Sequence, residues 1–267
     1  MDKYMKMDIK PLIETFPEVG KILDHYGIGC VPCTVGTCKL EDVVKFHTLP
    51  PQDEAEMMFQ VEKASYPERD VPRPKVRADA GPPRPREITY SPPVQRLVDE
   101  HNWIKRLLAL IPGIVDEIRA SDEIDSELLL AAVDFIRGYA DRFHHMKEED
   151  ILFDYTDRNA TIVQVIFQDH DQARGFVREI VQAVEDGDRD TLCDNLINYR
   201  ELLTEHIAKE DNILYLYIDR ALTTSQVGQV FQRFEESENG LADDVPRKYE
   251  QFILSLTDRF QGEQVLQ

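Results

Sequence analysis

The stretch FHHMKEEDILF, residues 143–153, decides the fold of the second half of this chain. Its His144 and Glu148 are four positions apart, so on a helix their side chains lie on the same face. That face also carries Ala140 one turn earlier and Ile136 two turns earlier, which predicts that it is buried. An unpaired carboxylate is costly in a protein interior, and a bound cation removes that cost. The stretch therefore predicts a metal-binding helix inside a helical core.

A second register is possible in the same stretch, because His145 and Glu149 are also four positions apart. Their face carries Asp141 and Arg142, two charged side chains that are expected to face water. We therefore predict that His144 and Glu148 point inward. His145 is expected at the surface, or behind the metal ligands.

The pattern recurs once, in EHIAKEDNILY, residues 205–215, where His206 and Glu210 have the same spacing. Apolar residues at helical spacing predict four amphipathic helices, at residues 94–120, 126–155, 161–184 and 191–218. The apolar stripe of each helix contains one histidine, and these are His101, His144, His170 and His206. Four such helices joined by short connections indicate an all-α protein with an antiparallel four-helix bundle.

The predicted interior thus contains four imidazoles and two carboxylates: His101, His144, Glu148, His170, His206 and Glu210. This combination suits iron, manganese or zinc rather than magnesium or calcium. Six ligands are more than one tetrahedral zinc needs, so they favour a pair of metal ions. A ferritin-like bundle would supply Glu-x-x-His pairs, and no histidine of this chain has a glutamate three residues before it.

Four segments, in this order, resemble the hemerythrin-like, or HHE cation-binding, family: LVDEHNWI, FHHMKEEDILF, FQDHDQAR and EHIAKEDNILY. The resemblance covers about residues 94–218. It implies that His101, His144, Glu148, His170, His206 and Glu210 hold two non-haem iron ions, with the glutamates bridging them.

One departure from that family bears on function. Oxygen-carrying hemerythrins use a fifth histidine one turn away on the third helix, where this chain has Ile166 and Arg174. The resemblance is therefore stronger to the di-iron proteins implicated in nitric-oxide stress and iron–sulfur cluster repair, which have four histidines and two glutamates. Those proteins also have a small cysteine-containing domain before the bundle.

The positions of the prolines and cysteines indicate how the rest of the chain is organised into domains. Eight of the 15 prolines lie within residues 66–93, which predicts an extended linker. We expect a small helical domain at residues 1–65, the bundle at 94–220 and further helices at 221–267. The small domain contains Cys30, Cys33 and Cys38. Its Cys-x-x-Cys resembles a redox-disulfide module, so these three cysteines are candidates for redox chemistry.

The chain has 31 basic and 51 acidic residues, a net charge of −20, which argues against nucleic acid or an anionic membrane as a partner. It has no apolar run long enough to span a bilayer and no secretory signal, so we expect a cytoplasmic protein.

The leading hypothesis is a redox-active di-iron protein that reacts with O2, NO or peroxide in nitrosative or oxidative stress or in iron–sulfur cluster repair. If it is an enzyme, we expect an oxidoreductase that acts on NO or peroxide, with the cysteine module delivering electrons or docking a redox protein partner. The alternative is a non-catalytic sensor or binding protein for O2 or NO that signals through the N-terminal cysteine domain. The sequence does not specify the oligomeric state, and a homo-oligomer is compatible with it.

Overall fold

The computed structural model describes residues 5–26, 28, 39–41, 49–74, 89–121, 123–239 and 245–264. The chain divides into two compact units, Met1–Thr89 and Tyr90–Gln267. Within the described ranges the regular elements are helices, and the one extended pairing is an isolated bridge between Asp8 and Lys39. The predicted all-α fold class is confirmed. Cys30, Cys33 and Cys38 lie outside the described residues.

The first unit contains three described helices, α2 (Ile9–Thr15), α3 (Pro17–His25) and α5 (Pro51–Ser65). Proline occupies the first turn of α3 and of α5, where its missing N–H has no helical partner to lose. These helices share a small apolar core, formed by Ile9, Leu12, Val19, Leu23, Ile28, Leu40, Met57 and Val61.

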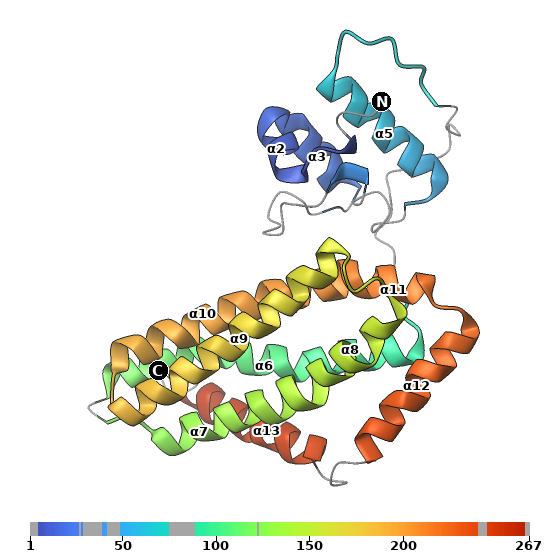
Figure 1. The fold of residues 1–267 in the computed structure, drawn as a ribbon. Helices are drawn as coiled ribbons and strands as arrows, with labels where there is room; N and C mark the ends of the chain where they lie inside the picture. The colour runs from blue at the N-terminus through green and yellow to red at the C-terminus, as the bar shows by residue number, and fades with distance from the viewer. Residues whose placement is uncertain are drawn as a thin grey trace. The chain divides into compact units, whose positions relative to one another are not determined.

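The second unit begins with the four helical segments of the predicted bundle, drawn from green to orange in Figure 1. The first is α6 (Pro92–Ala120), and the third is α9 (Thr161–Asp186). The second segment consists of α7 (Ser126–Phe135), η1 (Ile136–His145), α8 (Met146–Asp150) and η2 (Leu152–Tyr155). The fourth consists of α10 (Arg189–Lys209), η3 (Glu210–Leu214) and α11 (Tyr215–Ala221).

Local signals in the sequence set the ends of these segments. Asp125 and Asp188 cap the N-termini of α7 and α10 by accepting hydrogen bonds from the backbone N–H of Leu128 and Thr191. Gly187 ends α9 in the left-handed conformation, with φ +69°, which glycine adopts without a steric penalty. The connection from α9 to α10 is therefore only two residues long, and the two helices lie side by side (Figure 1).

Two of the segments are interrupted by π-helix. Both η1 and η3 have i→i+5 hydrogen bonding, and each is continuous with α-helix on either side. The first interruption ends at His145 and the second begins at Glu210. The departures from regular α-helix thus coincide with the two His-x-x-x-Glu pairs.

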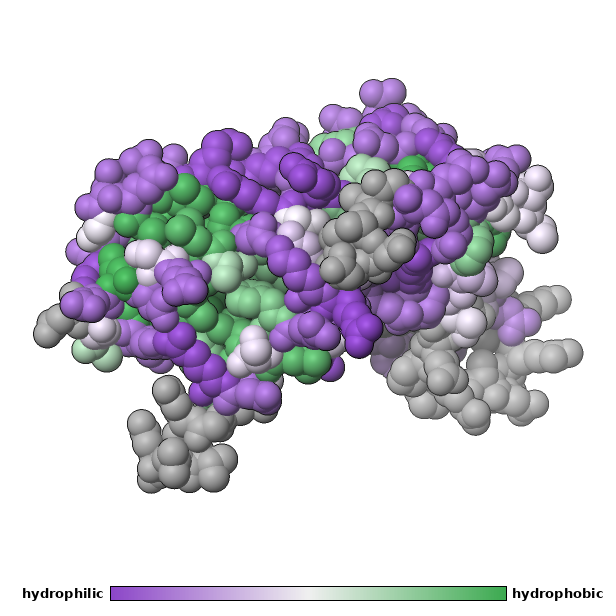
Figure 2. All heavy atoms as spheres, turned by 90° about the horizontal axis from the view of Figure 1, so that it is seen from below, coloured by the Kyte–Doolittle hydropathy of each residue, from purple (hydrophilic) through white to green (hydrophobic). Residues whose placement is uncertain are grey.

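Two helices follow the bundle, α12 (Thr224–Asn239) and α13 (Val245–Gln264), and both pack against α6. Tyr249 of α13 contacts the ring of Phe135, with centroids 5.9 Å apart, so α13 extends the bundle core. Figure 2 shows apolar residues gathered on the face of α7 and α13. Leu130 on α7 and Leu254 on α13 are exposed large hydrophobic residues. None of the described helices is both long and apolar enough to cross a membrane.

Candidate metal centre

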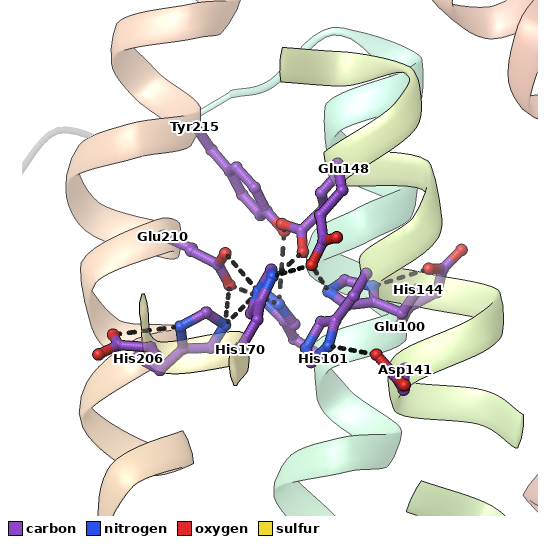
Figure 3. Close-up of polar contacts among 12 residues, drawn as sticks. Glu100, His101, Asp141, His144, Glu148, His170, His206, Glu210 and Tyr215 are labelled. Atoms are coloured by element: carbon purple, nitrogen blue, oxygen red, sulfur yellow. Dashed lines mark hydrogen bonds and ion pairs between the residues drawn. The ribbon is translucent and has the colours of Figure 1, made fainter. Parts of the chain in front are cut away.

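The bundle interior brings together all six residues that the sequence predicted as ligands. His101 comes from α6, His144 from η1, Glu148 from α8, His170 from α9, His206 from α10 and Glu210 from η3. Each is at most 1% exposed. Figure 3 shows their polar atoms pointing toward one another between the helices.

One group of potential ligand atoms comes from His101, His144 and Glu210, which lie within 4.8 Å of one another. His101 Nε2 is 3.3 Å from Glu210 Oε2, and the rings of His101 and His144 have centroids 4.5 Å apart. A second group comes from Glu148, His170 and Glu210. Glu210 belongs to both groups, so its carboxylate lies between two potential cation positions.

A third group consists of His145, His170 and His206, again with ligand atoms within 4.8 Å of one another. His170 Nε2 and His206 Nε2 are 3.2 Å apart. The ring of His145 stacks on that of His170, with centroids 3.8 Å apart. Three imidazoles therefore converge at one end of the cluster, and two, from His101 and His144, at the other.

The position of His145 corrects the expectation that it lies at the surface, because it is 4% exposed. On an α-helix, adjacent side chains diverge by about 100°, so two neighbouring histidines do not both point at one centre. The π-helix η1 has wider turns than an α-helix and ends at His145, so both histidines face the interior. A fifth histidine is present after all, on the second helical segment instead of the third.

Each of the five imidazoles has a carboxylate oxygen within 3.5 Å of its Nδ1 atom; four of these contacts are hydrogen bonds, and the fifth, His145–Asp141, is an ion-pair contact without one. The distances from Nδ1 to the nearest carboxylate oxygen are 2.7 Å for His101–Asp211, 2.9 Å for His144–Glu100, 3.5 Å for His145–Asp141, 2.6 Å for His170–Glu149 and 3.4 Å for His206–Asp169. Carboxylates in this position fix the tautomer of a metal-binding histidine, leaving Nε2 for the metal, and raise its basicity.

Four of these carboxylates follow one rule around the bundle. Glu100, Glu149, Asp169 and Asp211 are each adjacent in sequence to a predicted ligand, and each contacts a histidine of a different helical segment. Each helical segment thus supplies a carboxylate to the histidine of the next segment along the chain, and the fourth segment supplies one to the histidine of the first. Sequence reasoning missed these residues, although the dipeptides Glu-His, Glu-Glu, Asp-His and Glu-Asp at the ligands were a signal that could have found them.

Burial and mutual repulsion set the ionisation of the cluster. Burial, with the nearby Glu210, raises the pKa of Glu148 well above its usual value. Burial also opposes ionisation of Glu210, but His206 and His101 hold its pKa well below the usual value. Glu210 and Asp169 in turn raise the pKa of His206 to about 9 against the effect of burial. Two carboxylates this close cannot both be ionised at low cost without a cation between them.

Buried polar atoms without a hydrogen-bond partner indicate whether a metal fits this site. Among the described residues, no hydrogen-bond partner is found for His144 Nε2, Glu148 Oε2 or either carboxylate oxygen of Glu210. Buried polar atoms are almost always paired, so several unpaired ones facing a common centre indicate a missing partner. All four are lone-pair donors of the kinds that bind iron, manganese or zinc. The site therefore fits one or more metal ions.

Two further buried side chains adjoin the ligands. The Tyr215 hydroxyl donates a hydrogen bond to Glu148 Oε1 at 2.5 Å, and its ring stacks on His101 with centroids 5.5 Å apart. Lys147 is fully buried and forms ion pairs with Glu100 and with Glu238 of α12. Tyr215 thus orients a predicted ligand, while Lys147 holds the carboxylate behind His144.

Comparisons with known proteins agree with this geometry. Residues 93–218 match the family model described as the hemerythrin HHE cation binding domain. Three curated proteins, all named as uncharacterized, are each 22% identical to the chain over 174 residues. One is from Mycobacterium bovis and two are from strains of Mycobacterium tuberculosis, and the match covers 62% of this chain and 67% of each relative. No solved structure matches significantly. The four helical segments that surround the cluster, residues 93–218, are a hemerythrin HHE cation-binding domain.

Proposed function

We propose that the bundle binds two iron ions and that its function is to react with a small molecule, O2, NO or peroxide. The ligands proposed are His101, His144, His145, Glu148, His170, His206 and Glu210. The observation that supports this most strongly is the convergence of five imidazoles on two buried carboxylates, each imidazole with its own carboxylate at Nδ1. Bound iron would supply the electrons for reduction of the small molecule.

The arrangement suggests unequal positions for the two metals. His145, His170 and His206 would hold one ion, and His101 and His144 the other, with Glu148 and Glu210 shared between them. The second position then has fewer imidazoles, which leaves more room there for a small molecule. The Tyr215 hydroxyl lies next to this second position, with its oxygen 3.4 Å from His101 Nε2. Burial and the Glu148 carboxylate raise the pKa of Tyr215 well above its usual value, so its hydroxyl remains a hydrogen-bond donor.

The proposed cellular role is a response to nitrosative or oxidative stress, or iron–sulfur cluster repair. For Cys30, Cys33 and Cys38 we propose electron delivery to the iron or docking of a redox protein. The support for this role is the Cys-x-x-Cys spacing in the sequence.

The test is iron content per chain after anaerobic purification. We expect about two irons in the wild-type protein and a loss of iron in Glu148→Gln and Glu210→Gln, because a carboxamide neither bridges nor neutralises two cations. Asp150→Asn and Glu205→Gln are matched controls, since both carboxylates are exposed on the same helical segments. One zinc per chain, or unchanged iron in both glutamine variants, would refute the di-iron centre.

A second measurement separates an enzyme from a sensor. The reduced protein is mixed with NO or hydrogen peroxide and a reductant, and the ligand consumed is counted. Consumption beyond one equivalent per di-iron centre supports an oxidoreductase. Consumption that stops at one equivalent supports the alternative, a protein that binds the molecule and signals its presence.

A further inference from the structure

A cavity of about 350 Å³ adjoins the cluster, between η1 and α9. His145 and His170 form part of its wall, so the cavity reaches the end of the cluster where three imidazoles converge. Much of the remaining wall is apolar and consists of Ile136, Ala140, Ala173, Val177 and the ring of Tyr199.

Four guanidinium groups line the same cavity, those of Arg137, Arg142, Arg174 and Arg178, together with one carboxylate, that of Asp141. Arg174 is already bound, because its Nη2 atom lies 2.7 Å from Asp141 and 2.8 Å from Glu149. The other three arginines are exposed, and no ion pair joins them to any described residue.

This concentration of positive charge is unusual for a chain with a net charge of −20. Unpaired arginines at the opening of a cavity attract anions and bind carboxylates through two parallel hydrogen bonds. An apolar wall behind them favours a ligand with an apolar body.

The size of the cavity argues against a diatomic molecule as its natural occupant. One water molecule takes up roughly 30 Å³ in the liquid, and O2 or NO is of similar size. A cavity of about 350 Å³ is an order of magnitude larger and falls in the range of sites for organic ligands.

We propose that this cavity binds a small organic carboxylate with an apolar body. Arg137 and Arg178 hold the carboxylate at the opening, Ala140, Ala173 and Val177 surround the body, and the far end points toward His145 and His170. Any chemistry on that far end rests on the di-iron function proposed above, whereas binding of the carboxylate does not.

The test is isothermal titration calorimetry with hexanoate as the probe and hexanol as the uncharged comparison, on iron-loaded protein. We expect hexanoate to bind with a Kd of about 1 mM or lower and hexanol at least tenfold more weakly, since hexanol lacks the charge-assisted hydrogen bonds. In Arg137→Gln/Arg178→Gln the Kd for hexanoate should rise at least tenfold. The matched control is Arg106→Gln/Arg247→Gln, which removes two exposed arginines that do not line the cavity.

Equal affinity in the cavity variant and the control, or no saturable binding of hexanoate by the wild-type protein, would overturn the proposal. Iron content is measured on the same samples. Normal iron without hexanoate binding contradicts the carboxylate site alone. Hexanoate binding by a protein that fails to load iron supports the carboxylate site and contradicts only the di-iron function.

Discussion

The imidazole rings of His145 and His170 lie nearly parallel, with centroids 3.8 Å apart and an interplanar angle of 16°. Burial lowers the pKa of both rings, and repulsion from the His206 imidazolium lowers both further; His145 also lowers the pKa of His170 in this way. Both are therefore neutral at physiological pH, which is the form that binds a metal. This pairing makes His145 as suitable a ligand as the four histidines on the predicted stripes.

We expect His145→Ala to lower the iron content from about two ions per chain to about one, because the three-imidazole position loses a ligand while the other keeps His101 and His144. Metal analysis and the optical spectrum of the oxidised protein measure the change. His25→Ala is the control, since His25 is exposed at the end of α3. Unchanged iron content and spectrum in His145→Ala would show that His145 is only a buried neighbour of the centre.

Lys147→Met should destabilise the metal-free protein by about 3–5 kcal/mol, because it leaves the buried carboxylate of Glu100 without its cation. Lys105→Met should cost less than about 1 kcal/mol, because Lys105 is half exposed where it pairs with Asp211. Urea denaturation followed by circular dichroism measures both free energies of unfolding. The double variant Lys147→Met/Glu100→Gln should recover part of the loss. Equal effects of the two single variants would contradict the buried ion pair.

The bundle could be predicted from the sequence because apolar residues repeat at helical spacing and each of the four stripes contains one histidine. The fold class is confirmed, and the six predicted ligands lie together in the structure. Of the two positions expected for His145, the surface position was wrong for a physical reason. That expectation assumed α-helical geometry, and the polar neighbours taken as a sign of solvent, such as Asp141, instead form the environment of a buried histidine.

Other features depend on contacts between distant parts of the chain, which no local pattern reveals. Glu238 lies 91 positions after Lys147, and nothing near either residue predicts their ion pair. Likewise, the packing of Tyr249 against Phe135 requires α13 to lie along the bundle, and the sequence of α13 alone does not specify which helix it covers. Such pairings emerge only when the whole core is assembled.

Gly138→Ala should destabilise the protein by about 1–3 kcal/mol, since an added Cβ would lie 1.9 Å from the Tyr249 hydroxyl oxygen. Helix propensity alone predicts the opposite, a gain of about 1 kcal/mol. Gly228→Ala on α12 meets no atom within 4 Å and should show only that gain. Thermal unfolding of both variants tests the contact. Adding Tyr249→Ala to Gly138→Ala should relieve the clash, and an additive double variant would contradict it.

Asp125 should contribute a pH-dependent part of the stability. Hydrogen bonds from the Leu128 N–H and Arg259, both 3.0 Å long, lower its pKa in the folded state. A carboxyl whose folded pKa is depressed stabilises the protein above its unfolded pKa of about 3.9, and this stabilisation is lost as the pH falls through the folded pKa. Wild type should therefore be more stable than Asp125→Asn at pH 6, by a few tenths of a kcal/mol for so exposed a group. The difference should vanish near pH 2.5 in urea denaturation, and a difference independent of pH would contradict the assignment.

Asp141→Asn should weaken iron binding about 10- to 100-fold without unfolding the bundle, as expected when the carboxylate behind a metal-binding histidine is removed. The matched control is Asp171→Asn. Both aspartates pair with Arg174, at 2.7 Å and 3.3 Å, but only Asp141 lies 3.5 Å from His145 Nδ1. Competition with a chromophoric chelator measures the affinity of each variant. If both variants lose iron equally, the effect acts through Arg174. If only Asp141→Asn loses iron, the effect acts through His145, because Asp141, unlike Asp171, lies close enough to that imidazole to hold it in the metal-binding tautomer.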